Sequence, residues 1–172
     1  MTSDAQSDSG VLGSLRSAGG VGAVRLEDRF DIGIDDLWSA LTDPDRLSRW
    51  LGEIKGDLRS GGEFRAHYFA SGWEGTGRIE SCEPPHRLLI STTSPDEPEG
   101  RIEVMLTPDG EHTVLVIEDR GLRLDQIAAY GAGNQIHVEH LAAYLAGAEL
   151  CDARSRWSEL HPAYQEMAAG LS

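Results

Sequence analysis

The sequence predicts an α+β domain in which a curved antiparallel sheet wraps around one long helix. The helix is predicted over residues 127–147, where apolar side chains recur at steps of three and four residues. Its apolar face carries Ile127, Tyr130, Asn134, Val138, Leu141 and Leu145. Most of the preceding chain alternates between apolar and polar residues, which is the pattern of half-buried strands. Strands that are segregated from helices along the chain favour an antiparallel sheet.

Two short helices are predicted directly after the first strand. Residues 24–32 alternate as a strand, and Asp35 can cap the helix that follows them. The sequence Thr42-Asp43-Pro44 ends this helix and begins a second one, because proline is favoured at the first helical position.

The remaining strands are predicted between residues 63 and 119. Turn residues separate five alternating segments, at 63–70, 73–82, 87–93, 101–106 and 113–119. The acidic segment 95–100 is interpreted as a solvated turn, and Pro108-Asp109-Gly110 as the turn of a hairpin.

The chain is predicted to be one domain, residues 22–150, with an extension at each end. Residues 1–21 are rich in small and polar side chains and have little to bury, so they are interpreted as a disordered tail. Residues 151–172 are predicted to be a helical extension that docks on the domain, with a break at Pro162. The apolar stripe of this extension consists of Trp157, Leu160, Tyr164 and Met167.

The composition argues against several classes of partner. Twenty-nine acidic and fifteen basic residues give a formal net charge of −14, which repels phosphate backbones and anionic lipids, so we expect no nucleic-acid binding. We also expect no membrane insertion, because no apolar run reaches the length of a membrane span, and no secretory signal is visible. Cys82 and Cys151 have neither metal nor redox spacing and are interpreted as thiols of a cytoplasmic protein.

Several segments resemble one protein family. Residues 30–51, FDIGIDDLWSALTDPDRLSRWL, resemble the opening signature of the activator-of-heat-shock-protein-90-ATPase-like family, within the START-like (SRPBCC) helix-grip superfamily. Gly61-Gly62-x-Phe64, GRIESCEPPHRL and the helix ending LAAYLAG are similar as well. The resemblance spans about residues 24–147. It implies a helix-grip fold, whose members include lipid carriers, hormone receptors, polyketide cyclases and aromatases.

One position departs from the family pattern. Many relatives carry Gly-Trp in the long helix before the His-rich turn, whereas this chain carries Gly133-Asn134. An amide in place of an indole implies a larger or more polar pocket. Because a buried amide needs partners, we expect Asn134 to bond to Asp119, to His137, to water or to a ligand.

A ligand-binding cavity is predicted between the sheet and the long helix. Polar groups on inward-facing positions need partners or a wet cavity, and Asp119, Asn134 and His137 are such groups. The alternative interpretation is local hydrogen bonding at strand ends, or an inward face assigned wrongly because of a β-bulge. The two interpretations are balanced for Asp119, and the alternative is favoured for Asp28 on the first strand. The predicted lining is Trp50, Phe64, Tyr68, Ile102, Val104, Leu115, Ile117, Asp119, Tyr130, Asn134, His137, Val138 and Leu141.

The pair His137 and His140 does not predict a metal site. Two histidines at i and i+3 can share an ion, but the spacing differs from H-E-x-x-H and from H-x-x-E-H, and no third ligand is obvious nearby. We therefore expect no metal and no other cofactor.

Three functions are compatible with the sequence. The first is binding of a small apolar or amphipathic molecule. The second is a cofactor-free cyclase, aromatase or hydrolase that uses Asp119 or His137 as general acid or base. The third is a protein-interaction module, as the co-chaperone that names the family would suggest. The sequence contains no nucleophile elbow, phosphate loop or dinucleotide fingerprint, so an enzyme is not required.

Overall fold

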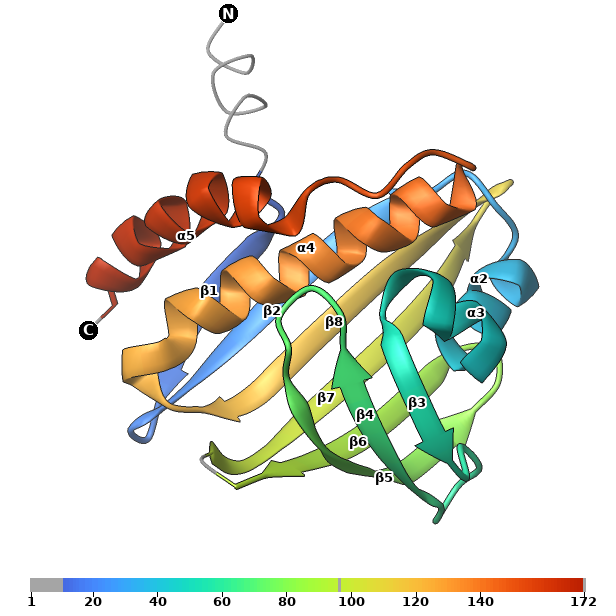
Figure 1. The fold of residues 1–172 in the computed structure, drawn as a ribbon, viewed down its shortest axis with the longest axis horizontal. Helices are drawn as coiled ribbons and strands as arrows, with labels where there is room; N and C mark the ends of the chain where they lie inside the picture. The colour runs from blue at the N-terminus through green and yellow to red at the C-terminus, as the bar shows by residue number, and fades with distance from the viewer. Residues whose placement is uncertain (1–10, 96, 172) are drawn as a thin grey trace, which may run out of the picture.

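The computed structural model describes residues 11–95 and 97–171 and shows one strongly curved sheet (Figure 1). Within these residues the sheet has eight strands in the order β1-β2-β8-β7-β6-β5-β4-β3, all paired antiparallel. The strands are β1 Gly13–Ala18, β2 Val21–Phe30, β3 Gly52–Gly56, β4 Glu63–Tyr68, β5 Glu74–Glu83, β6 Arg87–Ser94, β7 Glu97–Asp109 and β8 His112–Leu122.

The helices cover the concave face and one end of this sheet. The long helix α4 (Ile127–Leu145), which follows the 3-10 turn η1 (Leu124–Gln126), lies across the concave face (Figure 1). Two short helices, α2 (Ile34–Thr42) and α3 (Pro44–Trp50), lie near its C-terminal end, and α5 (Ala153–Ala169) packs along it. The predicted α+β helix-grip architecture is confirmed. No helix in the described part of the chain is long and apolar enough to cross a membrane.

Local sequence explains how the two short helices begin. Pro44 occupies the first turn of α3, and the Asp43 carboxylate accepts the Asp45 backbone N–H at 3.0 Å, as predicted for a capped start. Helix α2 begins differently from the prediction, because its N-cap is Gly33 and no side chain caps it. Asp35 lies instead in the first turn, where its negative charge interacts favourably with the positive end of the helix dipole.

The N-terminal segment differs from the prediction. Residues 13–18 form β1, which pairs with residues 21–26 of β2, whereas the sequence suggested a disordered tail through residue 21. Gly19 and Gly20 have φ angles of 62° and 84° and make the tight turn that such a hairpin requires. Residues 1–10 of that predicted tail lie outside the described residues.

The sheet is also more extensive than predicted elsewhere. Residues 52–56 form β3, which the sequence pattern did not indicate. Strand β7 begins at Glu97, so most of the segment interpreted as a solvated turn belongs to the sheet and pairs with β6. Composition was misleading here, because acidic residues do not prevent the backbone of a segment from pairing in a sheet.

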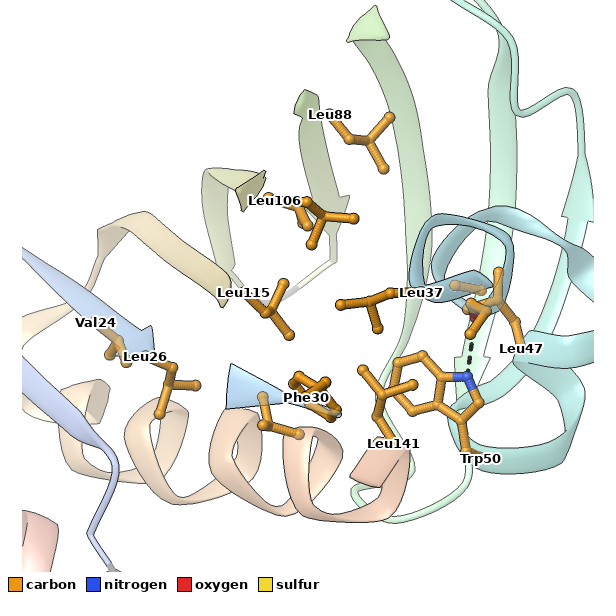
Figure 2. Close-up of a cluster of buried hydrophobic side chains, with 14 of the residues drawn as sticks. Val24, Leu26, Phe30, Leu37, Leu47, Trp50, Leu88, Leu106, Leu115 and Leu141 are labelled. Carbon is orange, nitrogen blue, oxygen red and sulfur yellow. Dashed lines mark hydrogen bonds between the residues drawn. The ribbon is translucent and has the colours of Figure 1, made fainter. Parts of the chain in front are cut away.

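A cluster of buried hydrophobic side chains joins the sheet and α4 to α2 and α3 (Figure 2). Leu37 is fully buried there and faces Leu115 of the sheet, while Leu141 of α4 approaches Trp50. The Trp50 indole N–H donates to the Ala40 carbonyl at 3.1 Å, which satisfies its polar atom inside the core.

Helix α5 docks through its apolar stripe and remains continuous through Pro162, contrary to the predicted break. Leu160 and Tyr164 are both fully buried against α4. Pro162 is exposed, and the carbonyl that its missing N–H would have bonded belongs to Ser158, also on the exposed side, where water can reach it.

Candidate functional site

A cavity of about 490 Å³ lies between the concave face of the sheet, the middle of α4 and the β4–β5 loop. Such a volume is within the usual range of small-molecule pockets, roughly 300–1,000 Å³. The walls consist mainly of aliphatic and aromatic side chains from β6, β7, β8, α3 and α4. The polar groups come from a few positions, chiefly Tyr68, Asp119, Asn134 and His137.

Most of the predicted lining residues meet at this cavity. They are Trp50, Tyr68, Ile102, Val104, Ile117, Asp119, Tyr130, Asn134, His137, Val138 and Leu141. Phe64 and Leu115 were predicted with them but do not line it. Leu115 is 1% exposed and belongs to the buried core cluster, together with Leu37 of α2. The Phe64 ring lies over Gly77, where a Cβ would come within 2.2 Å of the ring.

Other lining residues were missed by sequence reasoning. They are Leu41, Leu47, Leu51, Ser71, Gly72, Leu88, Ile90, Thr92, Gly100, Leu122, Gln126, Ala129, Gly133 and Trp157. Alternation in β6 carried a usable signal, since Leu88, Ile90 and Thr92 share one face. Trp157 comes from α5, and no local pattern indicates that this helix reaches the cavity.

Asp119 is placed in the wall by the alternation of β8, which puts it on the same face as Ile117. Its neighbours across the sheet are Ile102 on β7 and Val24 on β2. The side chain is 5% exposed, and its Oδ2 accepts a hydrogen bond from Asn134 Nδ2 at 2.9 Å. The structure thus selects Asp119 among the partners expected for Asn134.

Asp28 is a different case from Asp119. It lies on β2, outside the cavity lining, and its carboxylate accepts the Arg29 backbone N–H at 2.8 Å. Partial burial raises the pKa of Asp28, and the nearby charge of Glu139 adds to that rise. Local hydrogen bonding, the interpretation favoured for this residue, is what the structure shows.

His137 and Tyr68 form the aromatic part of the polar cluster. The two rings meet edge to face with centroids 5.0 Å apart, and Tyr68 also stacks on Trp73 at 5.0 Å. Burial, with a smaller effect of nearby His140, lowers the pKa of His137 to about 4, so the ring is neutral at pH 7. Its Nε2 is buried, and within the described part of the chain it has no hydrogen-bond partner.

The polar side chains of residues 137–140 (HVEH) point in different directions. His137 faces the cavity, whereas His140 Nε2 lies 3.1 Å from the Cys151 carbonyl oxygen. Glu139 accepts two hydrogen bonds from Arg156 of α5, both at 2.8 Å. Among the described residues no group of three or more His, Cys, Asp or Glu side chains is arranged to hold a metal ion.

The depressed pKa of His137 predicts a specific loss of stability in acid. Between pH 6.5 and 4 the unfolded state binds a proton that the folded state does not, so the free energy of unfolding falls as the pH falls through this window. The loss attributable to His137 is at most about 3 kcal/mol. Urea unfolding of wild type and His137→Leu across this window measures it. Parallel curves for the two proteins would contradict the prediction.

Comparison with known proteins places the chain among solved structures of the same architecture. The crystal structure of CalU16 from Micromonospora echinospora is 29% identical, with a TM-score of 0.78 over 91% of this chain and 96% of that chain. DynU16, a protein in the dynemicin biosynthetic locus, is also 29% identical, with a TM-score of 0.67 over 72% of this chain and 47% of its own length. Protein MLL2253 from Mesorhizobium loti is 26% identical, with a TM-score of 0.65 over 74% of this chain and 99% of its own.

A search of curated proteins found no match. The family comparison, in contrast, matches residues 31–146, which include both short helices, β3 to β8 and all of α4. These elements build the cavity apart from Trp157 of α5, and they carry the segments whose resemblance was noted in the sequence. The chain therefore belongs to the family of activator of Hsp90 ATPase homolog 1-like proteins, within the SRPBCC helix-grip superfamily.

Proposed function

We propose that the protein binds a small, mostly apolar molecule in the cavity under α4. The observation that carries this proposal is the combination of a ligand-sized space, about 490 Å³, with apolar walls and a few convergent polar groups. Well-packed interiors contain few voids larger than a water molecule, so an opening of this size in the middle of a small domain needs an explanation.

The polar groups lie together, so the ligand has one defined polar end. Asp119 and Asn134 are hydrogen-bonded, and Tyr68 contacts His137, which lies one helical turn after Asn134. Aliphatic residues such as Ile102, Val104 and Leu141 form the rest of the wall. This distribution orients an amphipathic molecule, with its polar group at the cluster and its apolar body along the sheet.

The pKa values of His137 and Tyr68 favour binding over acid–base catalysis by these two groups. A general acid or base works best when its pKa lies near the working pH. The pKa of His137 falls to about 4, and burial together with the charge of Asp119 raises the pKa of Tyr68 to about 12. Both values lie far from neutrality, so these groups serve better as fixed hydrogen-bonding partners than as proton carriers.

The comparisons supply a context for the ligand. DynU16 is a protein in the dynemicin biosynthetic locus, and its likeness to this chain fits a natural product or a biosynthetic intermediate as the bound molecule. Cys82 and Cys151 are free thiols, which fits the reducing cytoplasm as the place of action.

Two measurements test the proposal. Native mass spectrometry of freshly purified protein is expected to detect a co-purifying small molecule. Titration with N-phenyl-1-naphthylamine, a neutral apolar dye that brightens in apolar sites, is expected to show saturable binding near one equivalent after that molecule is removed. A protein that carries no molecule and gives no saturable dye signal would overturn the proposal.

A further inference from the structure

The charge inside the cavity has one sign. Among the described residues that line it, Asp119 is the one acidic side chain, and no Lys or Arg contributes to the wall. Asn134 donates to the Asp119 carboxylate and holds it against the cavity, between Val24 and Ile102 of the neighbouring strands. A ligand with its polar end at this cluster therefore meets a carboxylate.

Two further features keep the electrostatic potential inside the cavity negative. His137 faces the same space but adds no positive charge near pH 7, because its pKa is lowered to about 4. The positive end of the α4 dipole acts only over the first turn, whereas Asn134 lies about two turns after Ile127, where the helix begins. The charge of Asp119 is felt at Tyr68, where it adds to the effect of burial in raising the pKa.

The rest of the wall is suited to a cation. Trp50, Tyr68, Trp73, Tyr130 and Trp157 all line the cavity. Aromatic faces attract ammonium groups through the ring quadrupole, most strongly where water is excluded. The overall charge of −14 raises the local concentration of cations and lowers that of anions.

Resting on the proposed binding function, we propose that the cavity selects an apolar molecule that carries a protonated amine, which pairs with Asp119, and that it discriminates against anionic amphiphiles. An ammonium group that enters the cavity loses its contacts with water and gains contacts with the Asp119 carboxylate and with aromatic faces. A ligand carboxylate would lose its hydration and lie beside a like charge, and no Lys or Arg among the described lining residues offsets that cost. Fatty acids are thereby disfavoured, although their apolar chains would fit the walls.

Three probes that share one aromatic body and differ only in the polar group test this selectivity. They are naphthylmethylamine, naphthylmethanol and naphthoate, which are cationic, neutral and anionic at pH 7. Dissociation constants from isothermal titration calorimetry at one salt concentration are expected to rise in that order, with the amine bound about tenfold or more tighter than the alcohol. Because the comparison uses wild-type protein, it does not depend on the folding of any variant.

A pair of variants assigns the preference to Asp119. Asp119→Asn removes the charge with little change in shape and is expected to bring the amine-to-alcohol affinity ratio close to one. Glu118→Gln makes the same change one residue earlier, on the opposite face of β8, where Glu118 pairs with Arg16 and Arg120. This control is expected to retain the wild-type ratio, with its melting temperature recorded to account for the lost ion pairs.

The outcomes separate the two proposals. If the neutral dye and naphthylmethanol bind but the amine has no advantage, or naphthoate binds best, the charge inference fails while the binding function stands. If the amine is preferred but the ratio survives in Asp119→Asn, the assignment to Asp119 is wrong. If neither the dye nor any of the three probes binds, the proposed function itself fails.

Discussion

Removal of residues 151–172 is expected to lower the melting temperature by about 10–20 °C. Leu160 and Tyr164 of α5 are both fully buried against α4. Burying a large apolar side chain stabilises a protein by about 1.5–3 kcal/mol, so these two residues together account for roughly 5 kcal/mol. For a domain of this size each kcal/mol shifts the melting temperature by about 2–4 °C.

Polar contacts make this loss larger. The Tyr164 hydroxyl donates to Gln135 Oε1 at 2.6 Å and accepts the Gly13 backbone N–H at 3.0 Å, so it joins α5, α4 and β1. Gln135 is itself fully buried and also accepts the Leu12 N–H at 2.9 Å. Deleting α5 exposes this polar cluster and the apolar residues Ala132 and Ile136 to water.

Point variants check the same interface without shortening the chain. Leu160→Ala is expected to cost about 2–5 kcal/mol, because it leaves a cavity at a fully buried site. Gln165→Ala, on the exposed side of the same helix, is the matched control and is expected to melt within about 1 °C of wild type. Differential scanning calorimetry measures all three proteins. A truncated chain that melts like the full one would mean that α5 contributes nothing to the fold.

The sequence predicted the fold well because several signals agreed along residues 24–147. Helical spacing located α4, alternation located β2 and β4 to β8, and Asp43-Pro44 located the start of α3. The strand β1 was missed although Gly19-Gly20 is a hairpin signal, because the polar composition around it indicated disorder. An edge strand needs few buried side chains when its backbone is paired, so composition underestimates it.

The site was harder to predict than the fold. Two residues on the same face of a strand can differ in whether they line a cavity or lie in the packed core, and alternation does not distinguish them. Leu115 and Ile117 lie on one side of β8, yet only Ile117 lines the cavity, whereas Leu115 is buried in the core cluster that also contains Leu37. The position of Leu37 depends on how α2 docks against the sheet, and no local pattern encodes that. The same holds for Trp157, which reaches the cavity only because α5 folds back along α4.

Asn134→Trp is expected to lower the affinity for N-phenyl-1-naphthylamine at least tenfold. Asn134 lies on the α4 face that lines the cavity, across from Asp119 on β8, so an indole there points into the space. The substitution also introduces the residue that the sequence resemblance implies at this position in many relatives. The amide is thus expected to be the feature that opens this cavity.

Asn134→Leu separates occlusion from the loss of the amide. Both variants lose the hydrogen bond to Asp119, so both are expected to lose about 1–3 kcal/mol of stability. Only the indole fills the cavity, so the leucine variant is expected to bind the neutral dye much more tightly than the tryptophan variant. Gln165→Trp, which adds an indole on the exposed side of α5, controls for an added fluorophore.

The measurement is a dye titration of each variant beside its melting curve and far-UV circular dichroism. A folded Asn134→Trp protein that binds the dye with wild-type affinity would place the binding site away from α4. Equal losses in the tryptophan and leucine variants would mean that the hydrogen bond to Asp119, rather than the open volume, maintains the site. A large loss in the tryptophan variant alone assigns dye binding to the space between α4 and β8, because the two variants differ there only in the size of one side chain.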